Sequence, residues 1–197
     1  VDLTKRKVYG DTDCLSSFLR LDEVSLLESI LDEIVIPKAV DQELRANGAP
    51  PQIVTNLDNL KEKKFIRVHD IDINSAEHQW YDEIRVEYQM NRGFPIGEGE
   101  AQAMALAIPN GGILASNNLS DIKYFVDKYR LPLLTSAYML AASVDNGQIS
   151  YVQYVPNGCV FFTDSGLQEY VAKCTHRAKP EERAGMMTYR KPHGRRR

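Results

Sequence analysis

Short apolar segments alternate along the chain with longer segments whose apolar residues recur every three or four positions. Runs of three or four mainly apolar residues predict strands, at residues 8–10, 34–36, 65–68, 113–115 and 131–134. The longer segments carry the period of an amphipathic helix, at residues 15–33, 37–46, 53–64, 75–90, 97–108, 119–130 and 137–144. Strands and helices that alternate in this way are typical of a parallel sheet covered by helices on both faces.

Proline and glycine residues mark where several of these elements begin and end. Pro37 suits the first turn of a helix, and Asn47-Gly48 ends that helix. Residues 1–147 are therefore expected to form one α/β domain, a three-layer α/β/α sandwich with a central, mainly parallel sheet. Residues 148–175 are expected to form a helical extension packed against this domain, and residues 176–197 a basic, flexible tail.

The composition is that of an ordinary globular protein. Hydrophobic residues make up 43% of the 197 residues and charged residues 26%, which gives no sign of disorder in the body. No apolar run approaches the roughly 20 residues of a membrane-spanning helix, and Val1–Lys7 lacks the apolar stretch of a signal peptide. We therefore expect a cytoplasmic protein with no membrane partner. Cys14, Cys159 and Cys174 are odd in number and lack CxxC spacing, so we expect reduced thiols, with Cys14 buried.

Charge is distributed unevenly along the chain. The formal net charge is −3, yet the segment Lys173–Arg197 is strongly basic and ends in Arg195, Arg196 and Arg197. An acidic body with a basic arm suits a metal site with an additional phosphate contact. A solvated tail without a partner is the simpler alternative, and an acidic partner protein is a third.

Acidic and amide side chains follow the expected strands or lie on the helices after them. In chain order they are Asp11, Asp13, Glu43, Glu98, Glu100, Asn117, Asn118 and Asp121. The ligand site of a parallel sheet lies at the carboxyl ends of its strands, so we expect several of these side chains to meet there. Clustered carboxylates repel one another unless a cation binds among them. Hard oxygen ligands with few candidate histidines favour Mg²⁺ or Mn²⁺ over zinc or copper.

Each of these residues also has an ordinary structural role available. Asp11 or Asp13 can cap a helix, and glutamates in a first helical turn are favoured by the helix macrodipole whatever their function. Glu43 alone is typical of a solvated helix residue. Thr12 and Ser116 are more often simple capping hydroxyls. The order of the whole series carries the functional signal, and no single acid does.

Other candidate sites are weaker. The histidines show no metal-ligand spacing; they are His69, His78, His176 and His193. Gly97-x-Gly99 lacks the third glycine of a dinucleotide-binding motif. Four aromatic residues could stack on bases, but their helical spacing favours a place in the core; they are Trp80, Tyr81, Tyr88 and Phe94.

The ordered series also resembles the motifs of the PIN domain family. Residues 11–15, Asp-Thr-Asp-Cys-Leu, are similar to the family's opening motif, in which an Asp-Thr pair follows the first strand. Residues 34–44 resemble the family's second element and residues 97–107 its third. Residues 114–118 fall where the family usually has a strand ending in Asp-Asp, and residues 131–135 resemble its last strand.

The resemblance spans residues 8–147 and implies a divalent-metal-dependent endoribonuclease, most often the toxin half of a bacterial type II toxin–antitoxin pair of the VapC kind. It implies Mg²⁺ or Mn²⁺ as cofactor, RNA as substrate, an antitoxin protein as partner, and a homodimer, since relatives commonly dimerise. The implied catalytic residues are Asp11, Glu43, Glu100 and Asp121. The implied metal ligands are Asp11, Glu43, Glu98, Glu100, Asn117 and Asp121. Contacts to substrate are expected from Thr12, Ser116 and Asn118, and from the basic tail through Arg195, Arg196 and Arg197.

Asn117 and Asn118 depart from the family pattern, because an amide oxygen can bind a cation but brings no negative charge. Metal affinity should therefore fall unless Asp121, one helical turn along, supplies the missing charge. We expect an active ribonuclease, since the other acids are kept in order. A catalytically weakened PIN domain that binds RNA or acts in regulation is the alternative, and a purely regulatory protein with a structural acid cluster is a more distant one.

Overall fold

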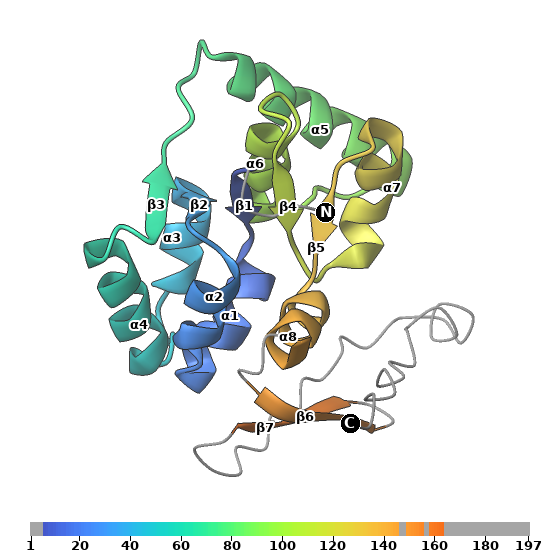
Figure 1. The fold of residues 1–197 in the computed structure, drawn as a ribbon. Helices are drawn as coiled ribbons and strands as arrows, with labels where there is room; N and C mark the ends of the chain where they lie inside the picture. Colours follow the sequence, from blue (N-terminus) through green and yellow to red (C-terminus); the bar gives the residue numbers. More distant parts are fainter. Residues whose placement is uncertain (1–5, 146–148, 156–157, 164–197) are drawn as a thin grey trace.

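A parallel sheet of five strands forms the centre of the molecule. The computed structural model describes residues 6–145, 149–155 and 158–163 (Figure 1). The strands lie in the order β3-β2-β1-β4-β5, and every neighbouring pair is parallel. They are β1 (Val8–Gly10), β2 (Ile34–Pro37), β3 (Ile66–His69), β4 (Ile113–Ala115) and β5 (Leu133–Leu134).

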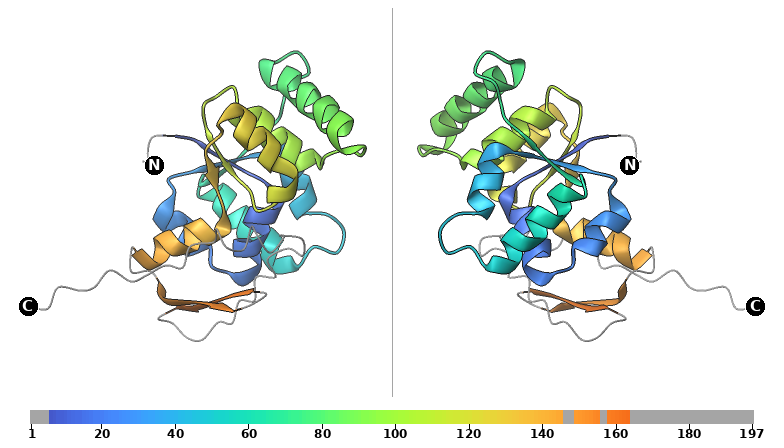
Figure 2. Two further views of the ribbon diagram at one scale, coloured as in Figure 1. Left: turned by 90° about the vertical axis from the view of Figure 1, so that its right-hand side faces the viewer. Right: turned by 90° about the vertical axis from the view of Figure 1, so that its left-hand side faces the viewer.

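Helices cover both faces of this sheet. Those in the described residues are α1 (Thr12–Leu21), α2 (Val24–Ile30), α3 (Lys38–Leu44), α4 (Pro51–Glu62), α5 (Ala76–Arg92), α6 (Glu98–Ala107), α7 (Leu119–Tyr129) and α8 (Ser136–Asp145). Figure 2 shows α5, α6 and α7 on one side of the sheet and α1, α2, α4 and α8 on the other. The predicted three-layer α/β/α sandwich is therefore confirmed.

Two hydrophobic clusters, one on each face, hold the layers together. Val8 packs into the cluster that contains Leu15, whereas the next residue, Tyr9, packs into the cluster that contains Phe125. This division follows from the alternation of side chains along a strand. Leu15 and Phe125 are fully buried, and burying a side chain of this size contributes about 1.5–3 kcal/mol.

The strand order switches beside β1. The chain runs from β1 to β2 and β3 on one side, and then returns to β4 and β5 on the other. Gly10 pairs with Ala115 at the carboxyl ends of β1 and β4, and the Asp11 amide donates a hydrogen bond to the Ala115 carbonyl at 3.0 Å. Open parallel sheets bind their ligands at such a switch point. Residues that follow β1 and β4 are thus brought together where chemistry is expected.

The structure differs from the prediction after residue 147. Ile149–Val155 and Gly158–Thr163 form β6 and β7, an antiparallel pair in a separate two-stranded sheet. The helical prediction for these residues is therefore wrong. Both segments are rich in β-branched and aromatic residues, which favour strands, and turn-forming Pro156-Asn157 separates them. Residues 164–197, with the remainder of the predicted extension and the basic tail, lie outside the described residues.

Two expectations from composition can be compared with the structure. Cys14 is a buried, free cysteine, as predicted. Within the described part of the chain, no helix combines the length and the apolar character needed to cross a membrane.

Candidate active site

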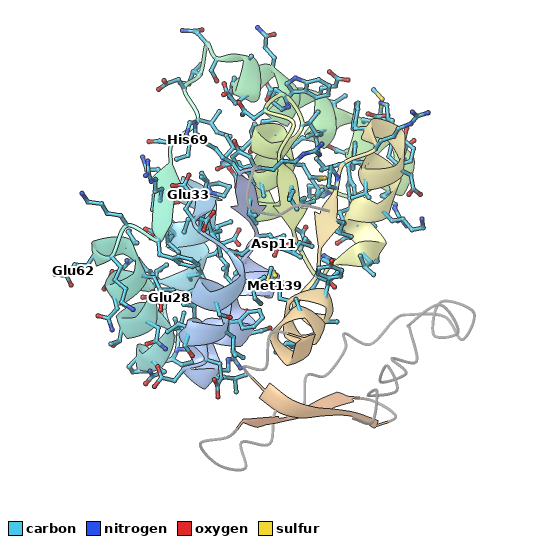
Figure 3. The ribbon with its side chains drawn as sticks, in the orientation of Figure 1. Asp11, Glu28, Glu33, Glu62, His69 and Met139 are labelled. Atoms are coloured by element: carbon cyan, nitrogen blue, oxygen red, sulfur yellow. The ribbon has the colours of Figure 1, made fainter. Side chains whose placement is uncertain are left out.

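Asp11 follows β1 and caps the N-terminus of α1. Its Oδ1 accepts a hydrogen bond from the Cys14 amide at 2.9 Å, so the capping role is real. Its second oxygen, Oδ2, is buried and has no hydrogen-bond partner among the described residues. Figure 3 shows Asp11 toward the centre of the molecule, beside the end of β1. A buried carboxylate oxygen without a partner is costly, so this position favours a bound cation or proton.

The environment of Asp11 favours its neutral form. Burial raises the pKa of Asp11 from 3.8 to about 7. The Ser116 hydroxyl and the Cys14 amide oppose this rise in pKa, and the negative charges of Asp13 and Glu100 add to it. In the absence of a cation this carboxyl is therefore only partly ionised at neutral pH.

Glu100, in the first turn of α6, lies in a similar environment. Burial raises its pKa, a hydrogen bond from Asn118 opposes the rise, and the charges of neighbouring carboxylates add to it. Those neighbours are Asp121, Asp13 and Glu43. The structure thus gathers five acids within electrostatic reach at one edge of the sheet. We refer to Asp11, Asp13, Glu43, Glu100 and Asp121 as the acidic cluster.

Glu43 is held in place by the starts of two other helices. Its Oε1 accepts a hydrogen bond from the Gly99 amide at 3.1 Å, and its Oε2 accepts one from the Thr12 hydroxyl. A Cβ atom on Gly99 would lie 2.8 Å from Glu43 Oε2 and 2.9 Å from Cγ2 of Val40. Only glycine permits this close approach of α6 to α3. Glu43 is exposed but fixed in orientation, so it differs from a freely solvated helix residue.

Asn118 connects two acids of the cluster. Its Nδ2 donates hydrogen bonds to Glu100 Oε1 and, at 2.6 Å, to Asp121 Oδ2. Its Oδ1 accepts a hydrogen bond from the Ser120 hydroxyl at 2.8 Å. These partners define which end of the amide is nitrogen, because a carboxylate can only accept. Asn118 therefore partly offsets the repulsion between two carboxylates.

Asn117 and Ser116 shape the turn after β4. Asn117 Oδ1 accepts hydrogen bonds from the Ser136 amide at 2.9 Å and the Ser136 hydroxyl at 3.0 Å, which ties this turn to the start of α8. The fully buried Ser116 accepts a hydrogen bond from the Asn118 amide at 3.3 Å. The two asparagines thus have different roles. Asn117 stabilises the backbone of the turn, and Asn118 binds the carboxylates.

A family model agrees with this arrangement. The model of DUF3368, described as a PIN domain, matches residues 7–154. The chain belongs to this PIN domain family. No curated protein matches it.

Several solved structures contain chains that are similar to this PIN domain in fold. One is the DNA-bound VapBC from Salmonella typhimurium, with 16% identity and a TM-score of 0.49 over 66% of this chain and 98% of that one. VapBC2 from Rickettsia felis, bound to a promoter DNA fragment, shows 19% identity and a TM-score of 0.47 over 66% and 98% of the two chains. FitAcB from Neisseria gonorrhoeae shows 18% identity and a TM-score of 0.46 over 66% and 99%.

Glu98 lies apart from the acidic cluster of the PIN domain, although it is only two residues from Glu100. Its Oε1 accepts hydrogen bonds from the Tyr81 hydroxyl at 2.9 Å and from Gln102 Nε2 at 3.0 Å. The structure therefore turns this carboxylate toward α5. The arginines expected to contact RNA, at positions 195–197, lie outside the described residues.

Two residues near the site were not assigned to it from the sequence. Asp13 was counted in the acidic series but given no role in the site, yet its charge raises the pKa of both Asp11 and Glu100. Its position two residues after Asp11, in the same turn, could have indicated that Asp13 lies beside the site. Tyr88 is a core residue, as expected from its spacing, but its hydroxyl also donates to Asp121 Oδ1 at 2.8 Å. Periodicity could not show this second role.

The side chains at the switch point suit a hard divalent cation in chemistry and in charge. The donors are carboxylate and amide oxygens, and Asp11 Oδ2 is a buried oxygen with no hydrogen-bond partner in the described part of the chain. However, no group of three or more His, Cys, Asp or Glu side chains within that part is arranged to hold a metal ion. Binding of an ion by three carboxylates therefore requires side-chain positions other than those in this structure.

Proposed function

We propose that this PIN domain is an endoribonuclease that depends on a divalent ion, Mg²⁺ or Mn²⁺, and hydrolyses RNA phosphodiester bonds. One observation carries the proposal. Asp11 is buried at the switch point of the sheet, its Oδ2 has no hydrogen-bond partner among the residues that the structure describes, and its pKa is raised to about 7. The helix cap uses the other oxygen of Asp11, Oδ1, whereas a cation beside Oδ2 would give this oxygen a partner and reduce the repulsion between the carboxylates.

The residues of the site divide into ligands and supports. Asp11, Glu43 and Glu100 would hold the ion through carboxylate oxygens, with Glu43 oriented by Thr12 and the Gly99 amide. A bound divalent ion supplies a water of lowered pKa and neutralises charge on the leaving oxygen. Asp121 adds negative charge beside Glu100.

A cleavage assay tests this function directly. The full chain is incubated with single-stranded and structured RNA in Mn²⁺ and, in parallel, with a chelator. Fragments that appear only with the ion, and that disappear in Asp11→Asn, are the expected result. Glu62→Gln is the matched control, because this exposed carboxylate on α4 lies far from Asp11 (Figure 3). Cleavage that persists in the chelator would refute the proposal.

An RNA-binding PIN domain with a weakened site is the second candidate, and the position of Asn118 favours it. Its amide nitrogen donates to both Glu100 and Asp121, so a cation that approaches these oxygens has to displace a hydrogen-bond donor. RNA that is bound in Mn²⁺ without being cut would support this candidate over the enzyme.

We propose further that the chain is the toxin of a bacterial type II toxin–antitoxin pair, is located in the cytoplasm, and binds an antitoxin and a second copy of itself. The order of its acidic motifs supports this role through the resemblance to VapC-like toxins. Growth arrest on expression, lost in Asp11→Asn, is the expected phenotype. Purification from the native host should recover the chain with a small acidic partner, and size-exclusion chromatography should show a dimer.

The basic C-terminal segment gives a separate test of the RNA contact. We expect removal of Arg195, Arg196 and Arg197 to weaken RNA binding and to make its salt dependence shallower, because each phosphate contact releases counterions. Unchanged affinity at low salt would exclude the contact. Loss of a protein partner with unchanged RNA binding would assign the arginines to the antitoxin.

A further inference from the structure

Tyr88 joins the hydrophobic core to the acidic cluster. Its ring is 2% exposed and packs against Phe94 and Phe125, with ring centroids 5.6 Å and 6.5 Å away. Its hydroxyl donates a hydrogen bond to Asp121 Oδ1 at 2.8 Å. The well-packed ring fixes where the hydroxyl lies, so the hydroxyl fixes one oxygen of Asp121.

The contacts continue from Asp121 to Glu100. Asp121 Oδ2 accepts a hydrogen bond from Asn118 Nδ2 at 2.6 Å, and the same nitrogen donates to Glu100 Oε1. Tyr88, Asp121, Asn118 and Glu100 therefore form an unbroken series of hydrogen bonds from α5 to the first turn of α6. We call this series the tyrosine relay.

The last residue of α5 also contacts the backbone of α7, the helix that carries Asp121. Arg92, one turn after Tyr88, donates from its guanidinium to the Ser120 carbonyl at 2.5 Å. Ser120 in turn donates its hydroxyl to Asn118 Oδ1 at 2.8 Å. Two side chains of α5 thus fix the first turn of α7, which carries Asp121.

We propose that Tyr88 is a positioning residue of the metal site, which orients Asp121 directly and Glu100 through Asn118. This inference rests on the proposed metal-dependent function. Tyr88 does not touch the ion or the RNA. Its hydroxyl sets the direction of carboxylates that would do so, and hydrogen bonds of this kind to ligating carboxylates tune a metal site.

The chain contains a matched control for this role. Tyr81 lies two turns before Tyr88 on the same face of α5, is also buried, and donates its hydroxyl to Glu98 Oε1 at 2.9 Å. Glu98 lies two residues before Glu100 on α6 but outside the acidic cluster. Tyr81→Phe and Tyr88→Phe remove the same atom from equivalent tyrosine–carboxylate pairs, and only the second pair belongs to the site.

Calorimetric titration of Mn²⁺ into the full-length variants measures the effect. We expect Tyr88→Phe to lower Mn²⁺ affinity by roughly 10- to 100-fold, and Tyr81→Phe to leave it unchanged. In RNA cleavage, kcat should fall in Tyr88→Phe while KM for RNA stays constant, because the hydroxyl contacts no substrate. Equal losses in both variants, or none in Tyr88→Phe, would overturn the inference.

A metal-free measurement separates this inference from the proposed function. Carboxyl carbon resonances of the glutamates and aspartates are compared by NMR in a chelator. The tyrosine relay predicts that Tyr88→Phe shifts the resonances of Asp121 and Glu100, whereas Tyr81→Phe shifts only that of Glu98. An unmoved Glu100 resonance refutes the relay even if the protein cuts RNA. A shifted one supports the relay even if the wild-type protein binds no ion.

Discussion

Asp11→Asn should change how the stability of the metal-free protein depends on pH. The substitution keeps the shape of the side chain, and Asn can still accept the hydrogen bond from the Cys14 amide that caps α1. It removes the one group in the site whose pKa is raised to about 7. The part of the pH dependence of the unfolding free energy that comes from Asp11 should therefore be absent in Asp11→Asn.

The sign and the magnitude of the expected change in unfolding free energy follow from the pKa shift of Asp11. A carboxyl whose pKa is raised on folding stabilises the folded state below its unfolded pKa, and this contribution is lost as the pH rises through the folded pKa. With a rise in pKa from 3.8 to about 7, wild-type protein should lose about 3 kcal/mol of unfolding free energy between about pH 5 and about pH 8.5 through this group. Asp11 is fully buried, so solvent does not screen the effect.

Urea unfolding in a chelator, at both pH values, measures this loss. Between the two pH values, the unfolding free energy of Asp11→Asn should fall by about 3 kcal/mol less than that of wild type. The control Glu62→Gln should show the full wild-type drop. Addition of Mn²⁺ at the higher pH should restore stability to wild-type protein and not to Asp11→Asn, since the ion takes the place of the proton. An equal pH dependence in wild type and Asp11→Asn would refute the reasoning.

Three further substitutions test separate contacts. Gly99→Ala places a Cβ atom 2.8 Å from Glu43 Oε2, so it should lower both Mn²⁺ affinity and stability, the latter by about 1–3 kcal/mol. Asn118→Asp puts a third carboxylate against two others, so it should destabilise the metal-free protein and raise Mn²⁺ affinity in calorimetry. Asn56→Ala leaves the buried Leu19 carbonyl without its 2.8 Å hydrogen bond, and should lower stability to urea by about 1–3 kcal/mol without changing cleavage.

For each of these substitutions, one result would contradict the prediction. Wild-type Mn²⁺ affinity in Gly99→Ala would mean that the orientation of Glu43 does not matter to the ion. An Asn118→Asp protein as stable as wild type in the chelator would show that the carboxylates do not repel one another as described. Altered cleavage in Asn56→Ala, with stability unchanged, would place this residue in the site.

The sheet could be predicted from the sequence because its strands are short apolar runs between clear turn residues. The position of Asp11 followed from the same pattern, since a residue after the central strand of an open parallel sheet lies at the switch point. The resemblance favoured Glu100 over Glu98, but periodicity alone could not distinguish the two glutamates. Most residues of α6 are themselves small and buried, so no polar face marks which glutamate points toward the site.

Other features depended on contacts that periodicity does not report. The second role of Tyr88 requires Asp121 from another helix, 33 positions away in the chain. The strands β6 and β7 were readable from their β-branched and aromatic residues, but the sheet domain directly before them led to an expectation of helices. Local pattern therefore predicts elements, and long-range packing decides which of their side chains meet.

The central place of β1 has a consequence for synthesis of the protein. A ribosome delivers Asp11 and Glu43 with the first two strands, Glu100 after β3, and Asn118 and Asp121 only after β4. A chain that ends before β4 thus lacks part of the acidic cluster on which the proposed nuclease function depends. The acidic cluster is complete only once β4 and the start of α7 have been made, so the proposed activity would begin late in synthesis.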